Sequence, residues 1–148
     1  MKRQVITMIG LGMFFLTLSA TTLHAQNAGT ISVNIPFGFA VDNKTLPAGD
    51  YYVRRSIEGA RVVVQIRSTD NLRTVYVPIH PVSATEIQTD SKLVFNKYGD
   101  QYFLSQLWMS GRSNGEELAR TSRERTLQRE MAKHSTKPET IAINGKLN

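Results

Sequence analysis

The segment 31–53, ISVNIPFGFAVDNKTLPAGDYYV, carries the clearest structural pattern in the chain. Apolar side chains occupy every second position of its first half: Ile31, Val33, Ile35, Phe37, Phe39 and Val41. A period of two places them on one face of an extended strand, so a strand is predicted over 30–41. Pro36 and Gly38 fall on the opposite face, and because proline cannot donate to a sheet, we expect an edge position or a bulge there.

A tight corner follows this strand. Pro47 and Gly49 suit the second and fourth positions of a type I turn. Tyr51 and Val53 then resume the alternation, which predicts a second strand over 50–56. The two strands share an inner apolar face, which is the beginning of a β-sheet core.

Further short alternating segments follow, separated by turn-forming residues. They predict five more strands, over 61–67, 73–78, 83–89, 92–98 and 101–108, and a short strand over 140–143. Pro78 and Pro81 interrupt this pattern, so Ile79 and His80 are expected to form a linker. Gly99 before Asp100 fits a type II′ hairpin turn between the last two long strands.

The segment 101–108 is apolar on both faces of its predicted strand. We expect Tyr102, Leu104 and Trp108 on one face and Phe103 and Leu107 on the other. Strands of this kind are usually covered on both sides, so a helix or a second sheet should cover the outer face.

A helix is predicted over 122–133, because Thr121 and Glu124 have the spacing of a capping box. Basic residues recur at every fourth position of this helix, at Arg125, Arg129 and Lys133. This spacing aligns them on one face, named here the basic face, opposite Leu127 and Met131. The basic face is either solvated or a contact for an anionic partner.

Together these elements predict a mainly β protein. The expected architecture is a single antiparallel β-sandwich or small barrel with one C-terminal helix. The alternative is an outer-membrane barrel, which needs strands of about 9–11 residues, longer than most strands here. The residues expected to be buried together are Phe37, Phe39, Tyr51, Val53, Val64, Phe95, Leu104 and Trp108.

Residues 1–25 have the order of a secretory signal peptide. A positive start at Lys2 and Arg3 precedes an apolar segment and a small-residue end at Ala25, the expected cleavage site. An N-terminal anchor is the alternative, although the apolar segment is shorter than the roughly 20 residues of a spanning helix. The predicted organisation is a signal peptide over 1–25, a β-domain over 26–120 and a helix with tail over 121–148.

The chain contains no cysteine. This excludes disulfides, thiolate metal sites and a lipid-attachment cysteine, and an exported domain without disulfides favours the bacterial envelope. The expected location is therefore the periplasm or the medium. Cleavage removes Lys2 and Arg3 and lowers the formal net charge from +6 to +4, which is modest for a nucleic-acid-binding protein.

No catalytic, cofactor-binding or metal-binding constellation is evident. The two histidines beyond residue 25, His80 and His134, lie on separate elements, and no His-x-x-x-His pair for zinc occurs. Most acidic residues fall at predicted turns, where aspartate caps backbone amides. A pair such as Asp50 and Asp100 could nevertheless face each other across a sheet, so an envelope hydrolase or isomerase remains the alternative function.

Two tyrosines, Tyr52 and Tyr76, are expected on the outer face of the sheet. Exposed aromatic rings can stack on glycans or extended chains, although aromatic residues more often fill cores. With the basic face they are the candidate partner contacts. The sequence thus predicts a non-catalytic envelope module, of binding or structural function, whose partner is an anionic lipid, glycan or protein.

Three blocks in the order NIPFGFAVDNKTLPAGDYYV, KLVFNKYGDQYFLSQLW and GEELARTSRERTLQRE cover most of the chain after residue 25. In this order they resemble a group of small exported bacterial proteins of the acidobacterial type. The resemblance implies export and a β-rich fold. It implies no catalytic residue and no ligand.

Overall fold

The computed structural model describes residues 29–134 and 137–148, and the predicted signal peptide lies outside these ranges. The described residues form ten strands and one helix. Their bounds are β1 (Thr30–Ile35), β2 (Phe39–Val41), β3 (Lys44–Leu46), β4 (Gly49–Glu58), β5 (Arg61–Ser68), β6 (Thr74–Ser83), β7 (Ser91–Tyr98), β8 (Gln101–Trp108), β9 (Asn114–Leu118), α2 (Ser122–Lys133) and β10 (Glu139–Leu147).

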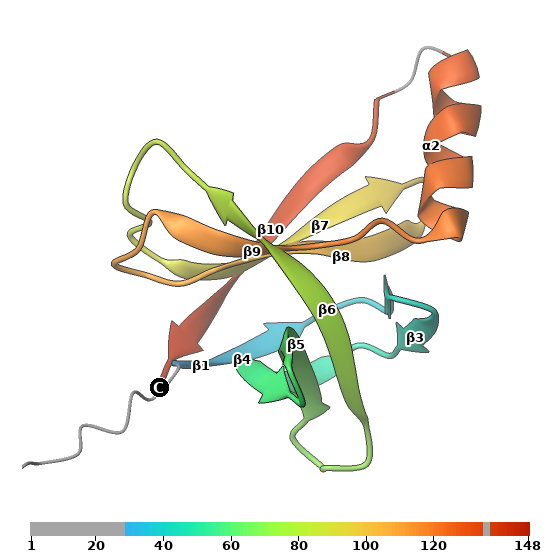
Figure 1. The fold of residues 1–148 in the computed structure, drawn as a ribbon. Helices are drawn as coiled ribbons and strands as arrows, with labels where there is room; N and C mark the ends of the chain where they lie inside the picture. Colours follow the sequence, from blue (N-terminus) through green and yellow to red (C-terminus); the bar gives the residue numbers. More distant parts are fainter. Residues whose placement is uncertain (1–28, 135–136) are drawn as a thin grey trace, which may run out of the picture.

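Eight of the strands close into an antiparallel barrel, in the order β8-β7-β10-β1-β4-β5-β6-β9. The closing pair is β8 with β9, where Gln106 lies opposite Glu117 and Leu107 opposite Glu116. Figure 1 shows β1, β4 and β5 below β7, β8 and β9, with β6 and β10 running between the two layers. The prediction of a mainly β protein with one C-terminal helix is confirmed, and the architecture is the barrel.

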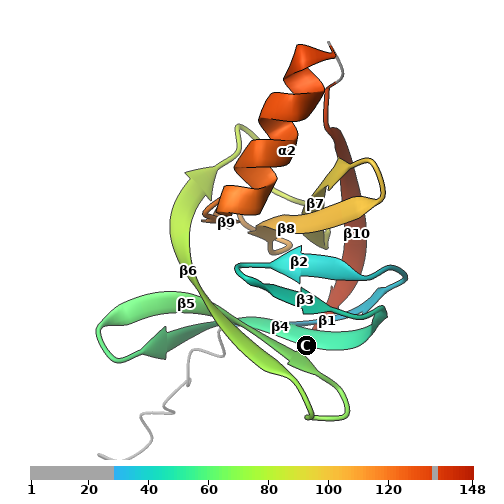
Figure 2. The ribbon, with the colours of Figure 1, turned by 90° about the vertical axis from the view of Figure 1, so that its right-hand side faces the viewer.

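The strand predicted over 30–41 is two strands. β1 ends at Ile35 and β2 begins at Phe39, because Pro36 cannot continue the hydrogen-bonded ladder. β2 pairs in parallel with β8 and antiparallel with β3. Figure 2 shows this β2–β3 hairpin between the two layers. Three of its side chains are buried in the core, namely Phe39, Val41 and Leu46. The hairpin therefore closes one end of the barrel.

The barrel interior holds the apolar core. Six of the eight side chains predicted to be buried together lie in one buried cluster: Phe39, Tyr51, Val53, Val64, Phe95 and Leu104. Phe37 is only half-buried at the edge of this cluster, where its ring stacks on Tyr102 with 3.9 Å between the centroids. Trp108 is buried outside the cluster, where its ring lies beside Gly115.

A β-bulge in β8 changes the predicted division of its faces. Val94 of β7 lies opposite Gln106 and Phe95 lies opposite Leu104, so Ser105 is an extra residue. Leu104 and Leu107 consequently both belong to the core, and Trp108 does not share their face. The bulge depends on the pairing with β7, which the spacing within β8 does not reveal.

The linker predicted at Ile79 and His80 is wrong, because β6 continues from Thr74 to Ser83 through Pro78 and Pro81. Its first half pairs with β5 along one edge, and its second half pairs with β9 along the other. Each half therefore has a free edge, where proline is tolerated. The strand predicted over 83–89 is also wrong, since residues 84–90 form a loop.

Candidate functional site at one end of the barrel

Two charged residues continue the inner faces of their strands. Arg55 follows Tyr51 and Val53 at the next inner position of β4, and its cross-strand partner is the buried Val64. Glu116 lies two positions before the buried Leu118 on β9 and opposite the buried Leu107. Because inner faces alternate with outer faces, both charged side chains belong to the inside of the barrel.

These two side chains meet across the barrel. Arg55 Nη1 lies 4.0 Å from Glu116 Oε1, which is too far for a hydrogen bond. The strands that carry them, β4 and β9, are separated in the sheet by β5 and β6. Only 9% of the Glu116 side chain is exposed, whereas 45% of the Arg55 side chain is exposed. The carboxylate thus lies deeper than the guanidinium group.

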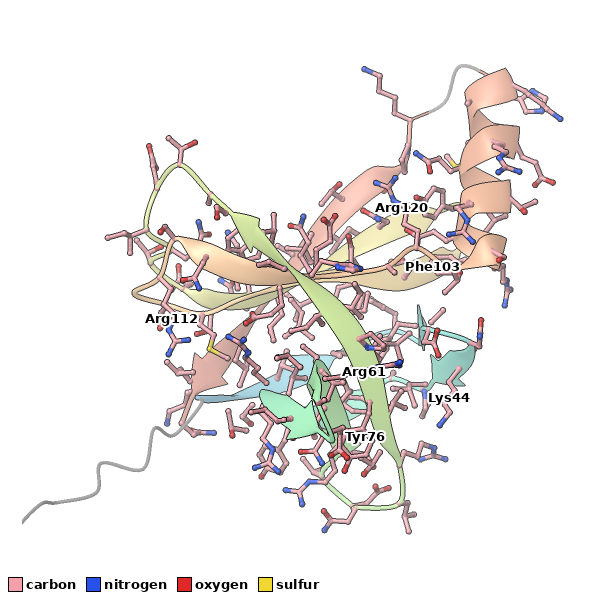
Figure 3. The ribbon with its side chains drawn as sticks, viewed as in Figure 1. Lys44, Arg61, Tyr76, Phe103, Arg112 and Arg120 are labelled. Carbon is pink, nitrogen blue, oxygen red and sulfur yellow. The ribbon has the colours of Figure 1, made fainter. Side chains whose placement is uncertain are left out.

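The two residues line a pocket of about 380 Å³, within the usual range for small-molecule sites. The residues of this barrel-end pocket are Arg55, Arg61, Val62, Pro78, Ile79, Pro81, Asn114, Gly115 and Glu116. The β2–β3 hairpin lies at the end of the barrel where β4 begins, because it immediately precedes that strand. Arg55 lies in the second half of β4, so the pocket is at the end of the barrel opposite the hairpin. Figure 3 shows Arg61 between the two layers beside β6, and Arg112 on the loop before β9.

The carboxyl group of Glu116 has an unusual environment. Burial raises its pKa, while the positive charges of Arg55 and Arg112 act in the opposite direction. Since the pKa remains raised, the loss of hydration outweighs the two nearby guanidinium groups. Glu116 can therefore accept a hydrogen bond when it is ionised and donate one when it is protonated.

The charges around the pocket are unbalanced. Arg55 and Arg61 are the cations of its lining, and Glu116 is the one acid among the described residues that form it. Val62, Ile79 and the two prolines supply apolar walls. Such a site suits an amphipathic molecule, with an apolar body against the walls and a polar group near the arginines.

The basic face of α2 is exposed at Arg125, Arg129 and Lys133. Arg125 is partly engaged, because its Nη1 donates to the Arg120 carbonyl oxygen at 2.8 Å and its Nη2 to Ser122 Oγ at 3.1 Å. The helix itself is confirmed over Ser122–Lys133, and Thr121 Oγ1 accepts from the Glu124 amide at 3.1 Å.

The side chain of Glu124 fixes α2 to the barrel instead of completing the predicted capping box. It is 3% exposed, and its Oε1 accepts hydrogen bonds from Asn96 Nδ2 at 2.9 Å and from the Tyr98 hydroxyl at 3.2 Å. Burial, followed by the charge and the hydrogen bond of Glu124, raises the pKa of Tyr98 to about 12. Tyr98 therefore remains a donor at ordinary pH.

The two candidate tyrosines lie on the outer face of the β4–β6 region. Arg67 lies over the Tyr52 ring at 5.7 Å from its centroid, and the half-exposed Tyr76 accepts a hydrogen bond from Gln65 at 2.9 Å. Figure 3 places Tyr76 in the lower layer, away from α2. The two tyrosines and the basic face are therefore separate surfaces, and none of these five residues lines the barrel-end pocket.

The acidic residues that were expected at turns differ in their surroundings. Asp50 lies on β4 opposite Asn34 of β1, whose side chain donates a hydrogen bond to it at 2.8 Å, and Asp70 accepts from the Leu72 amide at 3.0 Å in the turn after β5. The hydrogen bond from Ser68 is the main reason that the pKa of Asp70 is lowered. Asp100 is exposed in the β7–β8 turn. Within the described ranges, no group of three or more His, Asp or Glu residues is placed to hold a metal ion.

In the comparisons with known proteins, the chain matches no family model, no curated protein and no solved structure. Among residues 29–134 and 137–148, no helix has the length and apolarity needed to cross a membrane.

Proposed function

We propose that the protein is an exported, non-catalytic binding module of the bacterial envelope, and that it binds a small amphipathic molecule in the barrel-end pocket. The observation that carries this proposal is the pocket itself, where arginines and a buried carboxylate stand beside apolar walls. Ligand sites of this kind are common at the ends of β-barrels.

The location is proposed as the periplasm or the medium, after cleavage near Ala25. The order of charge, apolar segment and small residues in 1–25 supports export, as does the lack of cysteine. The barrel directs its apolar side chains inward, which suits an aqueous compartment. Mass spectrometry of the native protein tests the cleavage, since retention of Met1 would contradict it.

The binding proposal can be tested by nuclear magnetic resonance with a library of small amphipathic molecules. We expect ligand-dependent shifts at the amides of Val62, Ile79 and Glu116. Val62→Trp should fill the pocket and abolish these shifts, whereas Val82→Trp, outside the pocket lining, should keep them. Shifts that survive Val62→Trp, or that occur only elsewhere, would contradict the proposal.

A second contact is proposed for the basic face of α2. Arg125, Arg129 and Lys133 are exposed on one side of the helix, which supports binding to an anionic lipid, glycan or protein of the envelope. Reversing all three charges should abolish binding to envelope fragments, whereas reversing Arg123 should matter less. Binding should also weaken with salt, because the Debye length falls from about 30 Å at 0.01 M to 3 Å at 1 M. Binding that is unchanged by the triple reversal would show a merely solvated face.

The alternative function, an envelope hydrolase or isomerase, has one specific observation in its favour. Glu116 is a buried carboxyl group with a raised pKa in a pocket, and such groups often act as general acids or bases. The described lining supplies no second carboxylate and no nucleophile beside it. Turnover in a glycan and ester screen that Glu116→Gln abolishes would favour the enzyme.

A further inference from the structure

The chemistry of the barrel-end pocket indicates which amphipathic molecules it takes, if the proposed binding function holds. We infer that it binds small amphipathic carboxylates, and that the ligand's carboxylate replaces Glu116 as the counter-ion of Arg55. Glu116 takes up a proton from solvent when this exchange occurs. The free protein thus contains an internal anion at the position that the ligand's anion comes to occupy.

The geometry at Arg55 is the first support. The Arg55 side chain is half-exposed at the pocket, and the distance of 4.0 Å from its Nη1 to Glu116 Oε1 leaves the pair without a direct hydrogen bond. Guanidinium groups bind carboxylates best through two parallel hydrogen bonds. An incoming carboxylate can form these bonds with Arg55, which Glu116 does not form.

The charges around Glu116 are the second support. The charged groups that act on it are Arg55 from β4 and Arg112 from the loop before β9, and Arg61 from β5 lines the same pocket. β6 and β8 place Pro81 and Leu107 opposite it, which do not titrate. A neutral Glu116 leaves two cations in the lining, so an anion is the favoured guest and a cation is not.

Burial is the third support. Glu116 is 7% exposed, so a second anion beside it would meet little solvent screening. Two carboxylates at close range do not both remain ionised, and the more buried one takes the proton. Octanoate binding should therefore be coupled to proton uptake, and octanol binding should not.

The experiment compares octanoate, octanol and octylammonium by titration calorimetry on the protein from residue 26 onward, in two buffers of different ionisation enthalpy. At a pH close to the pKa of free Glu116, we expect octanoate to bind at least about tenfold more tightly than octanol, the ratio that one charge-assisted hydrogen bond supplies, and octylammonium to bind least. Binding of octanoate should be accompanied by the uptake of as much as one proton by the protein. At pH values above the pKa of free Glu116, where a full proton is taken up, the affinity for octanoate should fall by about tenfold per pH unit.

Three variants separate the parts of the inference. Glu116→Gln should bind octanoate without proton uptake and without this pH dependence. Because Arg55→Gln alone would leave Glu116 without its counter-ion, the informative variant combines Arg55→Gln with Glu116→Gln, and it should lose the preference for octanoate over octanol. Arg54→Gln removes the same charge from the neighbouring, exposed position of β4 and should leave that preference unchanged.

The outcomes distinguish this inference from the proposed function. Equal affinities for octanoate and octanol at a pH close to the pKa of free Glu116 would overturn the carboxylate class and leave the pocket as a ligand site. A preference for octanoate without proton uptake would overturn the exchange at Arg55. If none of the three probes bound, and the amphipathic library also produced no shifts at the pocket, the proposed function itself would fail.

Discussion

Removal of the Glu124 carboxylate should release α2 from the barrel. Glu124 is buried and accepts two hydrogen bonds from β7, from Asn96 and Tyr98. The apolar residues of the helix, Leu127 and Met131, are only half-buried. We therefore expect Glu124→Ala to free the helix while the closed barrel remains folded.

The expected magnitude follows from the two bonds. Each hydrogen bond to a charged group contributes about 1.5–3 kcal/mol, so loss of both weakens docking by about 3 kcal/mol at the lower limit. This corresponds to a change of about 100-fold in the equilibrium between docked and released helix. A helix of 12 residues is marginal in water without a docking surface, so the released segment should unfold.

Hydrogen exchange, followed by mass spectrometry, measures the release and unfolding of α2 directly. The amides of residues 122–133 should exchange about 100-fold faster in Glu124→Ala, and about tenfold faster in Tyr98→Phe, which removes one bond. Glu130→Ala is the matched control, because Glu130 lies exposed on the same helix. Equal protection of α2 in Glu124→Ala and Glu130→Ala would refute the idea that Glu124 holds the helix on the barrel. If the barrel amides of Glu124→Ala lost as much protection as those of α2, Glu124 would instead support the whole fold.

Three other predictions concern the core and the pocket. Phe39→Ala should lower the free energy of unfolding, measured by urea titration, by about 3–5 kcal/mol. The reason is that the ring is only 1% exposed and packs edge-on against Tyr51 and Phe95. A loss below about 1 kcal/mol would contradict this packing. Burial raises the pKa of Glu116 above its ordinary 4.5, so the wild-type protein should lose stability as the pH rises from below 4.5 through that raised pKa. Glu116→Gln should lack this loss and be more stable at neutral pH, and equal pH profiles of the two proteins would argue against a buried carboxylate. Replacing both Arg55 and Glu116 with Leu should leave stability unchanged or raise it by about 1–4 kcal/mol while octanoate binding is lost, and a large destabilisation would show that the pair is structural.

Features that depend on a few neighbouring residues were predictable from the sequence. The helix spans 122–133 as predicted, because Thr121 caps an amide only three residues away. Gly99 adopts a φ of 59°, as the first position of the predicted type II′ turn requires. The LPAG corner likewise joins β3 to β4, and the Tyr51 hydroxyl donates to the Pro47 carbonyl oxygen across it at 2.7 Å.

Features that depend on distant partners were not predictable in this way. Pro78 and Pro81 are compatible with a continuous strand only because β6 exchanges one partner strand for another between them. The extra residue in β8 depends on its register with β7. The choice between sandwich and barrel likewise depends on β9, which was not predicted as a strand and which pairs with the distant β6 on one side and with β8 on the other.

The barrel-end pocket does leave a signal in the sequence. Arg55 occupies the inner position after Tyr51 and Val53, and a charge at such a position is unusual in a core strand. Glu116 likewise precedes Leu118 by two positions. What the sequence could not supply is their proximity, since β4 and β9 face each other only after the barrel has closed.

The two ends of the barrel differ in a way that stability alone does not explain. At one end the β2–β3 hairpin covers the core with apolar side chains, including Phe39 and Leu46. At the other end, Arg55 and Glu116 interrupt the same inner pattern, although a partly buried pair 4.0 Å apart recovers little of its lost hydration. Apolar residues at these two positions would extend the core, so the fold alone does not account for the charged pair. Because of this difference between the ends, the barrel-end pocket, rather than α2, is the first place to test the proposed binding function.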